Sequence, residues 1–545
     1  MVNDNLIFTT LGLACTLALL LLTENYARQR KLKLPLPPGP PKLPIVGNLL
    51  NLPRGFEWFT YMRWGKEYHS DIIHLDIAGS SVLVVNTSEA AFELMDRRSA
   101  LYSSRPLMTM THELYGWKED FIFMPYSNLW RECRKLFHQE LNPSDAAYHE
   151  PNALKASRLL INSILETPED WRYKFRYMAG TLILSITYGI TAQPSSDPFI
   201  EAAEVALKSV TEAARPGAFL VDQFPWLRHV PSWFPGASFK KKAREWRMYK
   251  DRMTDGPFNV VMKQIAQDTA HQSFLLRAYH SLPHDKSEAE KVKYMREVAR
   301  LTAVSMFTGG TATTLAAFSS FVLAMVCNPQ YQAKAQEELD RVLGSVSLPD
   351  FKDRDSLPYV SAIVKEVQRW QPVGPLGIAH LLQGEDIYKG YRIPKNTIIV
   401  PNVWAMLHNE TVYGPDPNKF NPERFLLLLK DGTNTNLKLN PAIPDPDADF
   451  GFGRRVCPGQ HVALSSLWIC IASVLAVFKL EKAVDEQGNV VEPTGEYIPS
   501  SIQNHPAPFK CSITPRSREH EMLIREAGLH ADMDLDQPEN LTVSS

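Results

Sequence analysis

Closely spaced cysteines are missing from this sequence. Its six cysteines form no CxxC motif and no tight cluster, and they stand at positions 15, 133, 327, 457, 470 and 511. Scattered cysteines argue against a disulfide framework and against a structural zinc site. We therefore expect a mostly reduced catalytic domain that faces the cytosol.

An excess of charge of one sign is also missing. The chain has 58 lysines and arginines against 60 aspartates and glutamates, so it offers no broad basic surface to a nucleic-acid backbone. We therefore expect no nucleic-acid partner. The GxGxxG fingerprint of a flavin or nicotinamide site is missing as well, so the chain has no evident site of its own for NADPH.

No repeat or low-complexity linker divides the 545 residues. Single cores rarely exceed roughly 250–300 residues, but enzymes built around a large cofactor are the usual exception. We expect a catalytic domain at 49–516, preceded by a membrane anchor with a basic flank at 1–34 and a proline-rich hinge at 35–48. Residues 517–545 form an acidic tail, for which we expect disorder and at most two helical turns.

The expected anchor is the uncharged run of seventeen residues at 6–22. This length is at the short limit of the about 17–25 residues that span a bilayer. Basic residues follow the run and Asp4 precedes it, which places the bulk of the chain in the cytoplasm. A cleaved signal peptide is the alternative, but its basic start and small-residue cleavage site are not evident.

Helical patterns dominate the middle of the chain, and strand-like runs such as 81–85 and 397–400 are few and short. A capping box at 287–290, with no proline before Pro329, predicts one helix of nearly forty residues. A second helix should run from Pro329 to Gly344, and apolar residues at 360, 363, 364 and 367 predict the buried face of a third. The expected fold class is mainly α with small β-sheets.

The most specific segment is 450–459, which reads Phe-Gly-Phe-Gly-Arg-Arg-Val-Cys-Pro-Gly and precedes a long apolar helix. Free N–H groups and the helix dipole can stabilise a Cys457 thiolate. Gly453 and Gly459 would let the backbone approach a flat macrocycle, Arg455 could neutralise an anionic substituent of it, and Phe450 could shield the sulfur. For an isolated cysteine, a buried small hydrophobic residue would be the preferred interpretation.

The surrounding spacing decides otherwise, because the segment resembles the cytochrome P450 signature Phe-x-x-Gly-x-Arg-x-Cys-x-Gly at every fixed position. The resemblance extends from the proline hinge to Pro515. Glu366 and Arg369 are similar to the family's Glu-x-x-Arg, and Arg424 lies in a segment similar to its Pro-Glu-Arg-Phe. The resemblance implies that these three side chains form a buried ionic lock.

Two further motifs resemble family segments that face the haem. Trp130 and Arg134 are similar to a Trp-x-x-x-Arg pair that reaches a haem propionate. Residues 309–314, Gly-Gly-Thr-Ala-Thr-Thr, resemble the oxygen-binding segment, which implies catalytic roles for Gly310 and Thr313. The family's usual acid position is Ala312 here, so proton delivery would need a water chain through Thr311 or Thr313, or less proton-dependent chemistry.

The resemblance implies a cytochrome P450 fold with haem b, Cys457 as the axial ligand of the iron, and a small apolar substrate. It also implies electron supply by NADPH–cytochrome P450 reductase, with cytochrome b5 as a further candidate donor. We expect contact with membrane lipid and a single-pass location in the endoplasmic reticulum membrane, with the catalytic domain in the cytosol. The sequence is similar to fungal microsomal members of secondary metabolism.

Two alternatives remain open at this point. Ala312 also fits a haem-thiolate isomerase or dehydratase that needs no reductase. A non-catalytic haem-binding or ligand-binding membrane protein would carry the same cysteine segment but form no product.

Overall fold

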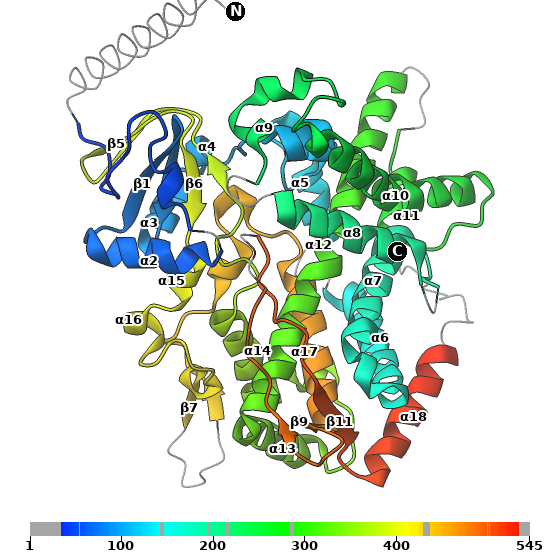
Figure 1. Cartoon of the computed structure of the whole chain (residues 1–545). Helices are drawn as coiled ribbons and strands as arrows, with labels where there is room; N and C mark the ends of the chain where they lie inside the picture. The colour runs from blue at the N-terminus through cyan, green and yellow to red at the C-terminus, as the bar shows by residue number, and fades with distance from the viewer. Residues whose placement is uncertain are drawn as a thin grey trace, which may run out of the picture.

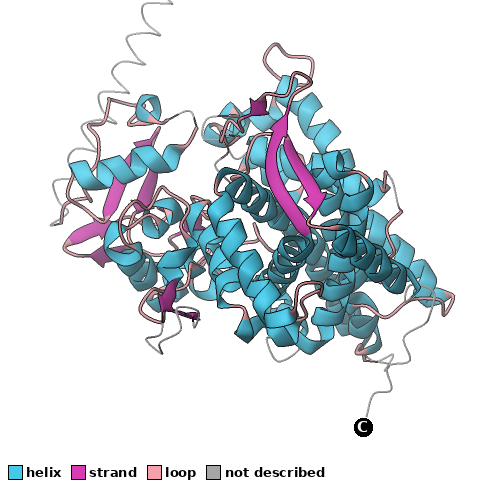
Figure 2. Ribbon diagram, turned by 90° about the horizontal axis from the view of Figure 1, so that it is seen from below, coloured by secondary structure: helices cyan, strands magenta, loops and turns pink. Residues whose placement is uncertain are grey.

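The computed structural model describes residues 34–53, 55–141, 146–193, 196–213, 218–283, 288–428, 437–498, 500 and 502–533. The expected membrane anchor at 6–22 lies outside these residues. A predominantly helical body is joined by a small sheet at one side, as Figures 1 and 2 show. The predicted class, mainly α with small sheets, is therefore confirmed.

The longer helices share one body. They are α2 (Glu57–Glu67), α5 (Asn128–Glu140), α6 (Ala146–Glu166), α7 (Trp171–Tyr188), α8 (Pro198–Ala213), α10 (Ser238–Ala266), α11 (Phe274–His280), α12 (Ala289–Cys327), α13 (Pro329–Leu343), α14 (Pro358–Trp370), α17 (Gln460–Val477) and α18 (Arg518–Met533). Shorter helices lie in the connections: α3 (Ser88–Ala91), α4 (Ser99–Tyr102), α9 (Leu220–Gln223), α15 (Val403–Leu407) and α16 (Glu410–Tyr413).

The strands are short and form four small sheets. The largest has the order β1 (Ile72–Ile77), β2 (Ser80–Val85), β6 (Ile398–Pro401) and β3 (His380–Leu381). The other three are β10 (Val490–Val491), β9 (Phe478–Val484) and β11 (Cys511–Pro515); β4 (Asp386–Tyr388) with β5 (Tyr391–Ile393); and β7 (Leu426–Leu428) with β8 (Leu437–Leu439). The two strand-like runs of the sequence are β2 and β6, which pair in parallel with Val84 opposite Val400.

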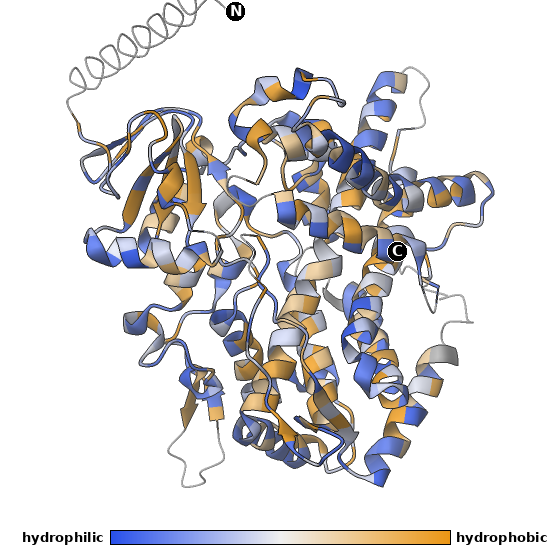
Figure 3. Cartoon of the chain, in the orientation of Figure 1, coloured by the Kyte–Doolittle hydropathy of each residue, from blue (hydrophilic) through white to orange (hydrophobic). Residues whose placement is uncertain are grey.

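Helix α12 is the centre of the fold. It has 39 residues, as the sequence predicts, and it contacts α5, α7, α8, α14 and α17. Ser287 of the predicted capping box lies outside the described residues, and the Glu288 side chain forms no cap. In the described part of the chain, α12 and α17 are apolar and long enough to cross a membrane, but 67% of the most apolar stretch of each is buried in the protein. Figure 3 shows this apolar centre in orange, so we assign both helices to the core.

The other helix predictions also hold. Helix α13 ends at Leu343, and Gly344 follows with a φ of +90°. The predicted apolar face of α14, residues 360, 363, 364 and 367, is fully or almost fully buried. It packs in one hydrophobic cluster with the apolar side chains of α17.

The acidic tail differs from the prediction. Residues expected to be disordered form α18, a helix of sixteen residues that packs against α6. Ile524 is fully buried, and a Cβ at Gly528 would lie 2.6 Å from the Cγ of Asn162. The high content of acidic residues suggested a solvated segment, although one face of the helix is apolar enough to pack. The expected disorder is therefore wrong for 518–533.

Candidate haem-binding site

Cys457 lies in the turn that leads into α17. Its backbone N–H donates to the carbonyl oxygen of Phe450 at 2.8 Å, which closes the loop between the two residues. Burial raises the pKa of the Cys457 thiol, whereas the N–H of Gly459 and the positive charge of Arg134 act in the opposite direction. Because a bound metal cation deprotonates a coordinating thiol, the sulfur of this half-buried residue fits a metal ligand.

The glycines of this loop have different roles. A Cβ at Gly453 would lie 2.2 Å from the carbonyl oxygen of Met95, so this glycine is required by packing against the chain backbone, and it is not among the residues that line the cavity described below. Gly459 lines the cavity, and the nearest atom to a Cβ there is the Cys457 sulfur at 4.0 Å. Gly451, which the sequence analysis did not single out, also lines the cavity and has a φ of +83°.

A cavity of about 380 Å³ extends from Cys457 to α12. Its wall includes Phe450, Val462 and Ala463 near the cysteine and Gly309 and Thr313 on the long helix. Most of the remaining lining side chains are apolar. The cavity therefore joins the sequence-predicted cysteine loop and the sequence-predicted helix segment, which are separated by more than a hundred residues in the chain.

The two glycines of α12 are not equivalent. Gly309 has no heavy atom within 4 Å of the position of a Cβ, so its missing side chain leaves space in the cavity. A Cβ at Gly310 would lie 2.7 Å from the Cγ1 of Ile183, so Gly310 permits close packing against α7 although it also lines the cavity. The Thr313 hydroxyl donates to the Gly309 carbonyl at 2.9 Å, and Ala312 beside it provides no carboxyl group.

Arg455 is buried and is held by backbone carbonyls. It donates to the oxygens of Ser103 at 2.7 Å and Met124 at 2.7 Å, and its guanidinium lies 4.3 Å from the centre of the Trp130 ring. Burial lowers the pKa of Arg455 to about 8, with a further contribution from neighbouring arginines. The Trp130 Nε1–H is buried and finds no hydrogen-bond partner among the residues that the structure describes.

Arg455 belongs to a group of cations, which we call the cation cluster and define as Arg105, Arg134 and Arg455. Arg134 donates to the Val456 carbonyl at 2.6 Å, and Arg105 donates to the Ala379 carbonyl at 2.8 Å. Burial lowers the pKa of Arg105 to about 9. Within the described ranges, none of the three forms an ion pair with a carboxylate.

Buried cations without a counter-ion are costly, so the cation cluster fits an anionic ligand. Two carboxylate groups carried by a planar macrocycle in the cavity would neutralise Arg105 and Arg455 and accept the free Trp130 N–H. The sulfur of Cys457 lines the same cavity. The residues present therefore fit a haem group.

Sequence reasoning missed Arg105 and His380. The His380 Nδ1 lies 2.7 Å from the Tyr102 carbonyl oxygen, and burial together with Arg105 and Arg455 lowers its pKa well below the usual value. His380 is thus neutral and adds no charge to the cation cluster. Neither residue lies in a motif, because only the tertiary fold brings strand β3 and the segment after α4 to Arg455.

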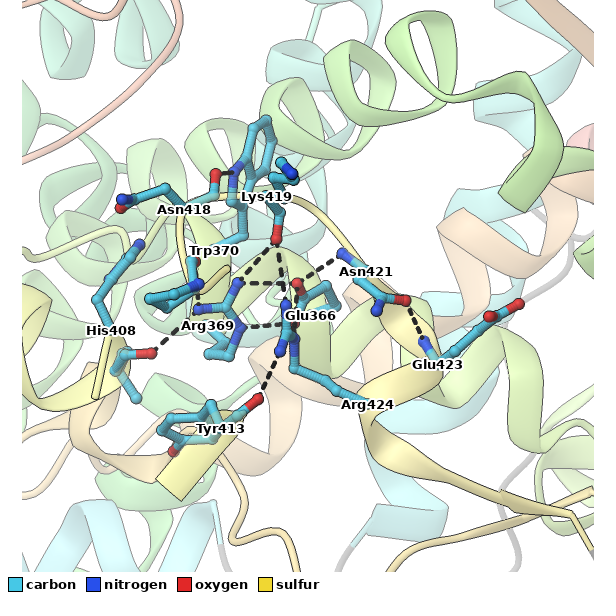
Figure 4. A network of polar contacts seen from close by, with 12 residues as sticks. Glu366, Arg369, Trp370, His408, Tyr413, Asn418, Lys419, Asn421, Glu423 and Arg424 are labelled. Carbon is cyan, nitrogen blue, oxygen red and sulfur yellow. Dashed lines mark hydrogen bonds and ion pairs between the residues drawn. The ribbon is translucent and has the colours of Figure 1, made fainter. Parts of the chain in front are cut away.

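The expected ionic lock is present between α14 and the segment that carries Arg424, as Figure 4 shows. Glu366 is fully buried and accepts from Arg369 at 2.6 and 2.8 Å and from Arg424 at 3.2 Å. The Asn421 backbone N–H also donates to Glu366 at 2.8 Å. Arg369 donates its remaining N–H groups to backbone carbonyls, including that of Pro417 at 2.8 Å. The lock ties α14 to the segment after α16.

A helical fold around a half-buried cysteine, a cavity and a cluster of cations suited to an anion defines a haem-thiolate class of protein. The cytochrome P450 family model matches residues 37–510, and the chain belongs to this family. The family implies a haem-iron cofactor, and its monooxygenases generally use a redox partner and a hydrophobic substrate.

Several fungal relatives align over nearly the whole chain. Cytochrome P450 monooxygenase 98 of Postia placenta is 46% identical over 96% of this chain and 98% of its own length. Cytochrome P450 monooxygenase ple1 of Rhodocybe pseudopiperita is 42% identical, covering 92% and 93%. Tryptamine 4-monooxygenase of Psilocybe cyanescens is 37% identical, covering 91% and 96%. The chain is a haem-dependent monooxygenase, and the isomerase and non-catalytic alternatives are not favoured.

Proposed function

We propose that Cys457 is the axial ligand of a b-type haem and that the enzyme inserts one atom of O2 into a small apolar secondary metabolite of a fungus. The observation that carries this proposal is the cavity itself. It joins the sulfur of Cys457, buried arginines that have no counter-ion among the described residues, and the open side of α12 at Gly309.

The residues of the site have separate tasks in this proposal. Arg455, Arg134 and the Trp130 N–H bind the acidic substituents of the haem, and the third member of the cation cluster assists them. Phe450 shields the sulfur from water, and Gly459 leaves room for the ring. The bound iron supplies oxygen activation, and a thiolate ligand favours O–O cleavage.

Thr313 provides the hydroxyl for proton movement beside Gly309. It lines the cavity and is exposed to it, so its proton can exchange between the Gly309 carbonyl and an acceptor in the cavity. Thr311, the other candidate, is buried and donates to the Phe307 carbonyl at 2.5 Å, so its hydroxyl does not reach the cavity to transfer a proton. Gly310 holds α12 close to α7 and thereby fixes the position of Thr313.

The electron donor in this proposal is NADPH–cytochrome P450 reductase, with cytochrome b5 as an additional donor, and Arg131 and Lys135 on α5 form part of its docking face. We place the enzyme in the endoplasmic reticulum membrane through a single helix at 6–22, with the catalytic domain in the cytosol. An aromatic segment supports contact with lipid. Its exposed side chains are Leu220 (64%), Trp226 (64%), Trp233 (79%) and Phe234 (51%), and such side chains favour the bilayer interface.

The test is the spectrum of the reduced, carbon-monoxide-treated protein. The wild-type enzyme should show a thiolate-type Soret band, and Cys457→Ser should lose it. Cys327→Ser is the matched control, because Cys327 is exposed at the end of α12, and it should keep the band. Product analysis after co-expression with a reductase then identifies the substrate. A Cys457→Ser protein that retains the thiolate band would contradict the proposal.

A further inference from the structure

Asp120 is a buried acid whose chemistry the haem site does not use. It follows a 3₁₀ turn at Trp117–Glu119 and packs against α12, with only 4% of its surface exposed. Its Oδ1 accepts from the Ile122 backbone N–H at 2.9 Å, whereas its Oδ2 is buried and, in the described part of the chain, has no hydrogen-bond partner of standard geometry. Burial raises the pKa of Asp120 to about 6, and the Thr308 and Ser305 hydroxyls and Lys250 act in the opposite direction.

The two hydroxyls that interact with this carboxyl group line the cavity, whereas Asp120 itself is not part of the cavity wall. Ser305 and Thr308 both line the cavity, one turn apart on α12 and just before Gly309. Ser305 donates to the Leu301 carbonyl at 2.9 Å, and Thr308 donates to the Val304 carbonyl at 2.9 Å. The proton of each hydroxyl is therefore used by a helix carbonyl or by the Asp120 carboxylate, and the hydroxyl oxygens present acceptor lone pairs to the cavity.

The loop that carries Asp120 is fixed to the same turn of α12. The Phe121 backbone N–H donates to the Ser305 hydroxyl oxygen at 3.0 Å, so Ser305 has one lone pair left and Thr308 is the freer acceptor. The carboxyl group behind them adds negative potential in a region of low dielectric. The local chemistry favours a positively charged or hydrogen-bond-donating group.

We propose that Ser305, Thr308 and Asp120 form an acceptor site in the cavity wall that binds the one hydrogen-bond donor, an ammonium or a hydroxyl group, of an otherwise apolar substrate. Ser305 and Thr308 contact the donor, and Asp120 is a positioning residue that acts through Thr308. This inference rests on the proposed function and names its substrate class.

The other charged groups of the cavity wall have different partners. Arg105 and Arg455 belong to the cation cluster, and His380 is held by the Tyr102 carbonyl. Asp449 also lines the cavity, but it accepts from the Gly374 backbone N–H at 3.2 Å and lies in the loop of the axial cysteine. The acceptor site on α12 is therefore suited to a substrate rather than to the cofactor.

The test measures ligand affinity in the ferric, haem-loaded enzyme by calorimetry near neutral pH. Three probes share the indole ring with its N–H and an ethyl chain, and differ only in the terminal substituent of that chain: tryptamine carries an ammonium group, indole-3-ethanol a hydroxyl group and 3-ethylindole a hydrogen atom. We expect tryptamine and indole-3-ethanol, which carry a second donor at the end of the chain, to bind at least about fivefold more tightly than 3-ethylindole, as one buried hydrogen bond allows.

Variants distinguish the role of Thr308, which contacts the ligand, from that of Asp120, which acts through Thr308. Thr308→Val should remove most of the preference for both donors, and Thr308→Ser should restore it. Asp120→Asn should weaken tryptamine more than indole-3-ethanol, because it removes charge but keeps shape. Thr302→Val is the matched control, because Thr302 is also buried on α12 and donates to its i−4 carbonyl at 2.8 Å but lies outside the cavity wall.

Equal affinities for the three probes, or no binding of any of them, overturn the proposal. An unchanged preference in Thr308→Val overturns it as well. The wild-type thiolate band is recorded on the same samples, so a failed acceptor site with an intact band is distinguishable from a failed haem assignment. The proposal is supported if the thiolate band is intact and the preference for donor ligands falls in Thr308→Val and Asp120→Asn but not in Thr302→Val.

Discussion

Glu366 shows how much a single buried carboxylate contributes to this molecule. It is the only acid that the structure pairs with Arg369 and Arg424 in the described residues, and both arginines lie in the interior. Breaking a buried pair by removing one partner leaves uncompensated charge. The lock is therefore a feature of stability, although it lies away from the chemistry.

Glu366→Gln should lower the free energy of unfolding by about 3–5 kcal/mol, because two buried guanidinium groups lose their counter-charge. Denaturant titration of the haem-loaded enzyme measures the change. Glu423→Gln is the matched control. Its ion pair with Lys334 is solvent-exposed, so it should cost less than about 1 kcal/mol. Equal losses for the two variants would contradict the role of burial.

Arg455→Met should reduce haem retention. The variant keeps the length of the side chain but removes the charge and the three bonds to backbone carbonyls. We expect faster haem loss to a scavenger protein, whereas Arg454→Met should behave like the wild type because Arg454 contacts Tyr126 at the surface. Haem loss at the wild-type rate in Arg455→Met would show that this residue does not bind the cofactor.

Because Asp120 titrates, we expect the preference for tryptamine over 3-ethylindole to depend on pH. The pKa of Asp120 is raised to about 6, so the negative charge is present above this value and lost as the pH falls below it. The charged group that faces it is Lys250 on α10, and Ser305 and Thr308 face it from α12. The advantage of tryptamine over 3-ethylindole should therefore shrink between pH 7 and pH 5. In Asp120→Asn the ratio should stay constant, and a parallel decline in both proteins would argue against Asp120.

Among the elements, α12 combines a structural glycine with a glycine that leaves open space. Gly310→Ala should destabilise the protein by about 1–3 kcal/mol, because its methyl group meets Ile183 of α7. In Gly309→Ala the added methyl group has free space, and alanine is a better helix former than glycine. The free energy of unfolding should therefore stay the same or rise by up to about 1 kcal/mol. The added methyl group enters the cavity, and ligand affinity should fall. Thermal unfolding and calorimetry distinguish the two effects, and similar unfolding of both variants would refute the assignment.

The sequence predicts the elements that carry their own local signal. The start and the end of α13 are marked by Pro329 and Gly344, and the buried face of α14 is marked by its apolar residues. The loop before α17 contains every position of the family signature. Asp120, Arg105 and His380 have no such signal, because tertiary contacts alone bring them to the cavity. Helix α18 was missed for a related reason, since Ile524 is stabilising only when it packs against α6.

At the scale of the whole molecule, removal of the first 36 residues should separate membrane binding from haem binding. A truncated protein that starts at Pro37 should be recovered in the soluble fraction and should keep its thiolate-type band. Residual binding to vesicles should then depend on Trp226 and Trp233, and replacing both with serine should reduce it in a sedimentation assay. A truncated protein that remains as membrane-bound as the full chain would contradict a single anchor.

If the cation cluster binds the haem as proposed, it should couple cofactor supply to the lifetime of the polypeptide. Newly made chains that have not captured haem keep three repelling guanidinium groups in a region with little water, and this lowers the barrier to local opening. Cellular proteases act on such opened forms. The abundance of the enzyme should therefore follow the rate of porphyrin synthesis even when its messenger RNA does not change.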